Sequence, residues 1–243
     1  MTAERRPLGH PSVQHTAAPN ASRRRALGRT AGSLVPLLAT ALPLSLPQRS
    51  LAQDPAVPLG APQTERNALL QLLARRQSSR SFRPDPLSDA VLANLVWAAA
   101  GINRPDSGRR TAPTANNRQE VDLYVATSRG LFLYEPKTNA LRLVQAGDLR
   151  DLTGRQGFVR DAAVNLVYVA DYARSSGATD EDKLLYAAAA TGFMSQNVYL
   201  YCASEGLATV VRAYVDRAAL GEAMKLRPTQ RITLAQSVGF PKA

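Results

Sequence analysis

Two short polar segments hold most of the residues in this chain that could bind a ligand. The first, residues 76–82, reads Arg-Gln-Ser-Ser-Arg-Ser-Phe and places Arg76, Ser78 and Arg80 within five residues. Guanidinium groups bind phosphate through paired hydrogen bonds, and a hydroxyl adds another donor. The segment therefore predicts a compact phosphate site. The alternative is a solvated basic turn that follows a helix.

The second segment, residues 113–119, reads Pro-Thr-Ala-Asn-Asn-Arg-Gln and offers mainly uncharged donors and acceptors. We expect it to be a loop that lines a pocket, which together with the basic segment indicates a phosphate-bearing cofactor. The competing interpretation makes Asn117 a turn residue and gives Gln119 a hydrogen bond at the start of a strand.

Histidine and cysteine are rare in this chain, and this limits the catalytic and metal-binding chemistry that is possible. The only histidines are His10 and His15, and the only cysteine is Cys202. If residues 1–52 are removed, a Ser-His-Asp triad, a Cys-His pair, a histidine-ligated zinc site and an intrachain disulfide all lack a required residue. Cys202 lies in an apolar helical pattern, so we interpret it as a buried side chain rather than a nucleophile. No metal site is predicted.

Five segments in order resemble the FMN-dependent nitroreductase family. Besides the two above, they are Gln-Asn-Val-Tyr-Leu at 196–200, Gly-Leu-Ala-Thr-Val at 206–210 and Val-Gly-Phe-Pro at 238–241. They cover nearly all of residues 65–243. The chain departs from the family pattern at Gln77, where an arginine is usual, and at Thr114, where a serine is usual. Residues 97–104 and the short chain are similar to the branch that contains azoline-oxidising dehydrogenases of peptide biosynthesis.

The resemblance implies an α+β fold with a central, mainly antiparallel sheet, flanking helices and a long core helix, assembled as a homodimer. It implies FMN in a groove between subunits, with Arg76, Ser78 and Arg80 at the phosphate and ribityl chain. Gln77 would lie near the pyrimidine side of the ring. Thr114, Ala115 and Asn117 would reach the flavin of the opposite subunit. Gln119, in the same loop, is included in the expected cofactor site.

Arg212 and Ala213 form the departure with the greatest mechanistic consequence, because the family commonly has Glu-Gly there. We include both residues in the predicted cofactor site. A cation at position 212 would raise the flavin reduction potential by stabilising anionic reduced flavin, or would bind an acidic substrate. The remaining interpretation is a surface residue on a strand.

The spacing of apolar residues, caps and breakers predicts the elements that position these segments. Helices are expected from Thr64 to about Arg76, at 90–100 after Ser88, at 180–205 before Gly206, and at 217–226. Strands are expected at 121–127, 130–134, 140–144, 163–170, 207–215 and 232–238, with a loop at 102–112. The strand at 163–170 is apolar throughout, which predicts a central position. The helix at 180–205 forms either the core of the subunit interface or a helix buried within one subunit.

Residues 1–52 resemble a twin-arginine export signal, because Arg23-Arg24-Arg25 precede an alanine- and leucine-rich stretch at 31–46. That stretch is too short and too rich in proline to be a permanent membrane anchor. Cleavage after Ala52 would leave 191 residues, with a linker at 53–63 and a flavin-binding domain at 64–243. A periplasmic location follows. The alternatives are a disordered basic extension or a transit peptide in a protein that is not exported by this route.

The net charge of +11 is a weak argument for nucleic-acid binding, because residues 1–52 hold seven of the 30 basic residues and one of the 19 acidic ones. The remainder carries +5, which suits an anionic cofactor. We therefore expect an FMN oxidoreductase with a small-molecule substrate: a nitroaromatic, quinone or enone acceptor, or a substrate that is dehydrogenated. NAD(P)H or another donor would supply electrons, and an exported enzyme would need another donor. The alternative function is a non-catalytic flavin-binding protein.

Overall fold

The computed structural model describes residues 59–242, so the predicted export signal and most of the predicted linker lie outside the described residues. The helices are α1 (Ala68–Arg75), α2 (Asp89–Ala100), α3 (Asp180–Glu205) and α4 (Arg217–Ala223). Short 3-10 turns are η1 (Thr64–Arg66), η2 (Pro105–Ser107), η3 (Ala115–Asn117), η4 (Arg150–Thr153) and η5 (Gly157–Arg160). No helix within 59–242 is long and apolar enough to cross a bilayer.

The strands are β1 (Phe82–Arg83), β2 (Ile102–Arg104), β3 (Arg109–Arg110), β4 (Val121–Thr127), β5 (Gly130–Glu135), β6 (Ala140–Ala146), β7 (Val164–Asp171), β8 (Ala208–Arg212) and β9 (Gln230–Pro241). Seven of them form an antiparallel sheet in the order β1-β9-β7-β4-β5-β6, with β8 also paired to β9. This confirms the predicted α+β class and the predicted hairpin of β5 and β6.

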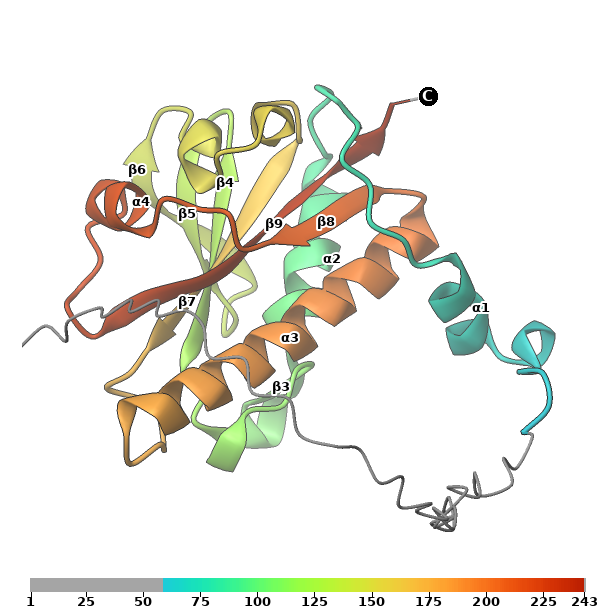
Figure 1. Cartoon of the computed structure of the whole chain (residues 1–243), viewed down its shortest axis with the longest axis horizontal. Helices are drawn as coiled ribbons and strands as arrows, with labels where there is room; N and C mark the ends of the chain where they lie inside the picture. Colours follow the sequence, from blue (N-terminus) through green and yellow to red (C-terminus); the bar gives the residue numbers. More distant parts are fainter. Residues whose placement is uncertain (1–58, 243) are drawn as a thin grey trace, which may run out of the picture. The chain divides into compact units, whose positions relative to one another are not determined.

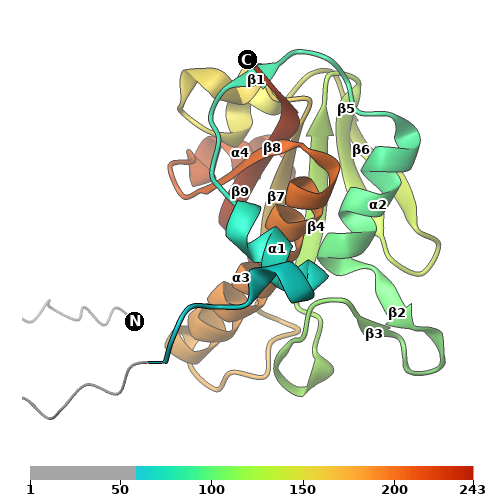
Figure 2. The same cartoon turned by 90° about the vertical axis from the view of Figure 1, so that its right-hand side faces the viewer.

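Strand β7 separates two hydrophobic cores because its successive side chains point to opposite faces. Leu166 and Tyr168 pack in the core that α2 and α3 cover, whereas Val167 and Val169 pack in the core that contains Leu220 of α4. All eight residues of β7 are buried, which confirms its predicted central position. Figure 1 shows α3 running diagonally across the sheet, and Figure 2 shows the β2–β3 hairpin beyond the end of α2.

Local caps define both ends of α3. Thr179 accepts from the backbone N–H of Asp182 at 3.1 Å, and Asp182 accepts in return from the N–H of Thr179 at 3.1 Å, forming a capping box. Gly206 ends the helix with φ of 68°, a left-handed conformation that glycine adopts without steric cost. The predicted bounds of this helix are confirmed.

Several predicted bounds are wrong. The first helix is divided because Asn67 is extended and its side chain caps α1, accepting from Leu69 N at 2.9 Å. The predicted loop at 102–112 contains the β2–β3 hairpin, whose polar strands lack the alternation that marks a half-buried strand. The strand predicted at 207–215 ends at Arg212, the last strand is longer at both ends, and α4 ends at Ala223.

Candidate active site

The predicted phosphate segment, residues 76–80, is here called the strap. It leaves α1 and runs beside β8, where Ser79 N donates to Thr209 O at 2.9 Å. The chain then enters β1, which pairs with the end of β9. The strap and β8, which are about 130 residues apart in the sequence, thus lie side by side, and the strap is fixed to the sheet.

Tyr199 of α3 holds the strap from the other side. Its hydroxyl lies 2.8 Å from Ser78 Oγ and accepts from Val211 N at 3.0 Å. The guanidinium carbon of Arg76 lies 5.2 Å from the centre of the Tyr199 ring, within the range of a cation–π contact. The sequence motif at 196–200 contains Tyr199, but no role was predicted for it.

A hollow of about 440 Å³ opens between the strap, the end of α3 and β8. Its polar lining comes from Arg75, Gln77, Ser79, Tyr199 and Thr209, and its apolar lining includes Leu207 and Pro241. Of the predicted strap residues only Gln77 lines this hollow, while Arg76 and Ser78 contact Tyr199 and Arg80 is exposed. The individual contacts predicted between the strap and a flavin phosphate stay predictions.

The polar loop, residues 114–119, has an unusual backbone. Asn116, Asn117 and Gln119 have φ of 50°, 52° and 51°. These values lie in the left-handed region, which residues other than glycine seldom adopt. Gln119 stabilises this conformation, because its N–H donates to Thr114 Oγ1 at 2.9 Å and its side-chain amide donates to Gly108 O at 2.9 Å. Backbone strain of this kind is common at ligand sites, where the surrounding structure maintains it.

Gln119 therefore positions the loop. Its side-chain amide also donates to Asn117 Oδ1 at 3.1 Å within the loop, while its bond to Gly108 O ties the polar loop to the β2–β3 hairpin. This agrees with the predicted alternative of a hydrogen bond just before a strand. Ala115 and Thr114 are half-buried and Asn117 is exposed, with Thr114 and Asn117 lining a second hollow.

The strap and the polar loop line different hollows. The hollow at the strap is lined by α1, α3 and β8, whereas the one at the polar loop is lined by residues 104–117. No hydrogen bond recorded within residues 59–242 joins the two segments. One chain therefore does not bring them together, although the sequence resemblance implies that both approach the same flavin.

Arg212 is buried at 6% exposure, so its interpretation as a surface residue is wrong. Its guanidinium donates to Ser237 Oγ at 3.1 Å, Asn165 Oδ1 at 2.7 Å, Thr153 Oγ1 at 3.0 Å and the carbonyl of Thr153. These four hydrogen bonds leave one of its five N–H donors free. Binding of an acidic substrate by Arg212 stays a prediction. Ala213 follows β8 and is exposed.

Burial lowers the pKa of Arg212 from 12.5 to about 10. No carboxylate within residues 59–242 forms an ion pair with it, so Arg212 is a buried cation stabilised by hydrogen bonds to neutral oxygens. Its charge remains at pH 7. The effect of Arg212 on the flavin reduction potential stays a prediction. The charge that would cause it belongs to a buried, hydrogen-bonded guanidinium and not to a side chain at the surface.

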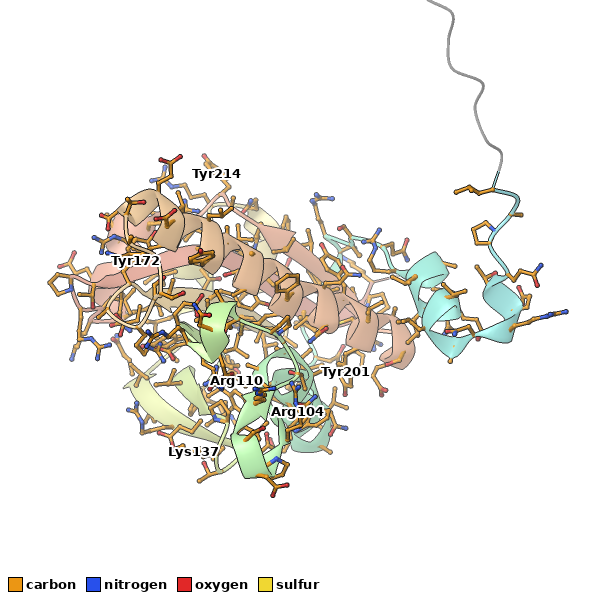
Figure 3. All side chains as sticks on the ribbon, turned by 90° about the horizontal axis from the view of Figure 1, so that it is seen from below. Arg104, Arg110, Lys137, Tyr172, Tyr201 and Tyr214 are labelled. Atoms are coloured by element: carbon orange, nitrogen blue, oxygen red, sulfur yellow. The ribbon has the colours of Figure 1, made fainter. Side chains whose placement is uncertain are left out.

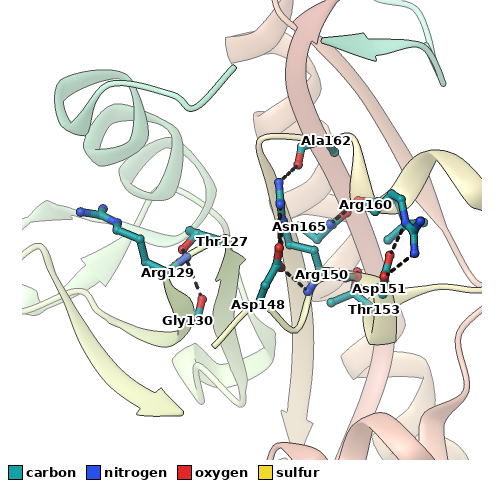
Figure 4. Close-up of polar contacts among 11 residues, drawn as sticks. Thr127, Arg129, Gly130, Asp148, Arg150, Asp151, Thr153, Arg160, Ala162 and Asn165 are labelled. Atoms are coloured by element: carbon teal, nitrogen blue, oxygen red, sulfur yellow. Dashed lines mark hydrogen bonds and ion pairs between the residues drawn. The ribbon is translucent and has the colours of Figure 1, made fainter. Parts of the chain in front are cut away.

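A braced turn presents Thr153 to Arg212. Arg150 forms an ion pair with Asp148 at 2.7 Å and donates to Ala162 O at 2.9 Å, while Arg160 pairs with Asp151 at 2.9 Å (Figure 4). The Asp148 pKa is lowered, chiefly by its hydrogen bond with Arg150. These contacts hold η4 against η5 and against the segment that leads into β7, and thereby fix Thr153 beside Arg212.

Comparison with known proteins agrees with this fold. The model of the nitroreductase family matches residues 73–240. A nitroreductase-family structure from Ralstonia eutropha JMP134 is 39% identical in sequence and superposes with a TM-score of 0.69. The match covers 79% of this chain and 88% of the Ralstonia chain. A Methanocaldococcus jannaschii protein assigned to the nitroreductases is 28% identical over 166 residues, which is 64% of this chain and 83% of that protein.

The microcin synthetase McbBCD complex of E. coli, solved with truncated pro-MccB17 bound, shares the fold. Its matching chain is 19% identical, with a TM-score of 0.64 and coverage of 88% of this chain and 85% of its own. The fold and the site define a flavin-dependent oxidoreductase. The chain belongs to the nitroreductase family, and it is an FMN-dependent enzyme.

The residues at the strap suit the phosphate of FMN. Arg75, Arg76 and Arg80 form no ion pair with any residue of 59–242, and no carboxylate lines the adjoining hollow. Ser79 and Thr209 add hydroxyl groups to that lining. Bound FMN would supply the hydride and electron transfer, while the protein would neutralise the phosphate and orient the ring.

Proposed function

We propose that this protein works as a homodimer with two composite flavin sites, each combining the strap of one subunit with the polar loop of the other. The separation of these segments within one chain supports this arrangement. So do the exposed large apolar side chains of α3: Leu184, Leu185 and Phe193 are 56%, 64% and 49% exposed. A cluster of exposed large apolar side chains marks an interaction surface.

Within this dimer, the proposed reaction is hydride exchange between a donor and a small organic molecule. The acceptor is a nitroaromatic, quinone or enone, or the enzyme dehydrogenates its substrate in the reverse sense. The described part of the chain contains no histidine, and burial raises the pKa of Cys202 to about 12. The protein therefore contributes binding, orientation and electrostatics rather than a covalent nucleophile. Donor and acceptor alternating at one site would give ping-pong kinetics.

The predicted export signal adds a proposal about the electron donor. An enzyme exported by the twin-arginine route would leave the cytosol folded and loaded with its cofactor, and so would be separated from cytosolic NAD(P)H. Weak turnover with NAD(P)H is expected. Replacing Arg23 and Arg24 by lysine and fractionating cells tests the export itself, and retention of the variant in the cytoplasm is the expected result.

The function is tested on the purified protein by three measurements. The visible spectrum should show bound flavin that is released as FMN on denaturation, light scattering should show a dimer, and a quinone should reoxidise the flavin after each of several cycles of photoreduction. A flavin-loaded monomer would refute the composite site. Bound flavin that no quinone, enone or nitroaromatic reoxidises would favour the non-catalytic alternative.

A further inference from the structure

The β2–β3 hairpin and the polar loop enclose a second hollow, here called the hairpin pocket, of about 470 Å³. The residues that line it are Arg104, Arg109, Arg110, Ala112, Pro113, Thr114, Asn116 and Asn117. Three guanidinium groups and three uncharged polar side chains thus face one space, with no carboxylate among them. Figure 3 shows Arg104 and Arg110 lying together on this hairpin.

These three arginines differ from half of the others in the described part of the chain, which form ion pairs. Eight arginines within residues 59–242 form ion pairs, at positions 83, 129, 142, 150, 155, 160, 174 and 227. The arginines of the hairpin pocket are not among them. Apart from the strap, they form the main group of neighbouring guanidiniums without a carboxylate partner in that range, so the pocket keeps a strong positive potential.

The pocket is a built feature and not a loose turn. Arg104 donates from Nη2 to Arg110 O at 2.9 Å, and Arg110 donates from Nη1 to Val121 O at 3.3 Å. Gly108, with φ of 63°, closes the hairpin and accepts from Gln119. Two arginine side chains are thus anchored to backbone, while Arg109 is exposed and makes no recorded side-chain hydrogen bond within residues 59–242.

Arg110 also has unmet hydrogen-bonding capacity. Its Nε is buried and has no partner among the described residues. Burial is the main cause of its lowered pKa, and the nearby cation of Arg174 lowers the pKa further, whereas Asp122 and Glu120 raise it from behind the pocket. These carboxylates stabilise the charge and are not among the residues that line the pocket.

We propose that the hairpin pocket binds an anionic group, a carboxylate or a phosphate, of the molecule that exchanges hydride with the flavin. This inference rests on the proposed function, because Thr114 and Asn117 both line the pocket and belong to the loop expected at the flavin ring. Guanidinium forks favour planar carboxylates and phosphates, which they bind through paired hydrogen bonds. The enzyme therefore selects acidic substrates, or a nucleotide donor, over neutral analogues.

Isothermal titration calorimetry on the purified full chain tests the pocket, with FMN content measured separately from the visible spectrum. The first pair of probes is 4-nitrobenzoate and its neutral analogue 4-nitrobenzamide. The second pair is NADH and the uncharged donor 1-benzyl-1,4-dihydronicotinamide, which transfer hydride to the flavin and are therefore compared by their apparent Kd for flavin reduction in anaerobic stopped-flow measurements. Each is measured with wild type, Arg109→Gln, and the matched control Arg66→Gln, which removes the same charge from an exposed arginine outside the pocket.

Arg109→Gln should weaken binding of an anionic probe about tenfold and leave its neutral partner unchanged. An effect on 4-nitrobenzoate assigns the pocket to a substrate carboxylate, and an effect on NADH assigns it to a donor phosphate. Equal behaviour of Arg109→Gln and Arg66→Gln with both anionic probes overturns the inference. So does a selective loss of FMN affinity in Arg109→Gln, because the pocket would then serve the cofactor. The proposed function itself would fail by a different result, namely wild-type protein that binds no FMN or shows no turnover.

Discussion

The hydroxyl of Tyr199 lies 2.8 Å from Ser78 Oγ, and the same oxygen accepts from the backbone of Val211 at 3.0 Å. One phenol therefore joins the long helix, the strap and strand β8. Its ring lies beneath Arg76 at 5.2 Å. The position of the predicted phosphate site relative to the sheet depends on this side chain, although Tyr199 carries no charge.

Tyr199→Phe should weaken FMN binding about tenfold and lower the free energy of unfolding by about 1–2 kcal/mol, because Ser78 and Val211 N lose their partner while the ring remains under Arg76. Flavin fluorescence quenching and urea unfolding measure the two effects. Tyr201→Phe is the matched control, since the Tyr201 hydroxyl donates to Val91 O at 3.2 Å away from the strap. Equal FMN affinities in the two variants would contradict the role of Tyr199.

Leu185→Glu should dissociate the proposed dimer and release flavin, because it replaces the most exposed of the large apolar side chains of α3 by a charge. Light scattering gives the mass and absorbance gives the FMN content. Leu143→Glu serves as the control, since Leu143 is 53% exposed on β6 and is not one of those side chains. A dimer that persists in Leu185→Glu with full FMN content would show that the interface lies elsewhere.

The elements whose ends are set by local chemistry could be predicted from the sequence. Ser88 accepts from Val91 N at 3.3 Å and begins α2, and Gly206 ends α3, both as expected. The β2–β3 hairpin could not be predicted, because its strands are polar and only three and two residues long, and because residues outside the two strands hold it in place. Thr111 N donates to Gly101 O at 2.9 Å, and Gln119 reaches the turn at Gly108.

Only part of the site could be predicted from the sequence, because some of its contacts join residues that are far apart in the chain. Arginine and hydroxyl groups within one segment indicate their own chemistry, whereas the partner of Ser78 lies 121 residues away. The burial of Arg212 did have a signal in the sequence. Asn165 and Ser237 are polar residues within apolar strand patterns, and buried polar groups require partners. Their pairing with Arg212 meets that requirement.

Gln119→Ala should increase the hydrogen exchange of the hairpin, residues 102–112, by about fivefold or more, because the variant loses the bond from its side chain to Gly108 O. Exchange mass spectrometry resolves the hairpin peptide. Gln71→Ala removes a comparable bond to Glu65 O at 3.1 Å and should leave the hairpin unchanged. Unaltered exchange in Gln119→Ala would mean that the β2–β3 pairing holds the hairpin without this contact.

Cys202 should react with a disulfide reagent far more slowly in the folded protein than in guanidinium chloride. A thiol whose pKa is about 12 instead of 9.0 has on the order of a thousandth of the thiolate at pH 7, and Cys202 is also buried. As the only cysteine in the chain, it gives an unambiguous signal. Cys202→Ala should retain turnover with a quinone, and loss of turnover with retained FMN would assign the thiol a role.

Arg212→Gln should lower the free energy of unfolding by about 2–4 kcal/mol, because Thr153, Asn165 and Ser237 lose donors in a buried network. The same variant should lower the flavin midpoint potential by on the order of 30 mV, about 1.4 kcal/mol for two electrons, since a cation that stabilises reduced flavin is removed. The charge is present at neutral pH because the lowered pKa of Arg212 is still about 10. Spectroelectrochemistry at pH 7 measures the potential.

Arg150→Gln separates the two effects of Arg212. Arg150 braces the same turn through Asp148 and Ala162, so its loss should destabilise the fold through the same region. Arg150 forms an ion pair, however, and its removal should leave the potential near the wild-type value. If both variants lower the potential equally, the shift reports a displaced turn. If neither does, the Arg212 cation acts only on stability, and its burial without a carboxylate serves to hold β7, β8, β9 and the turn at Thr153 together.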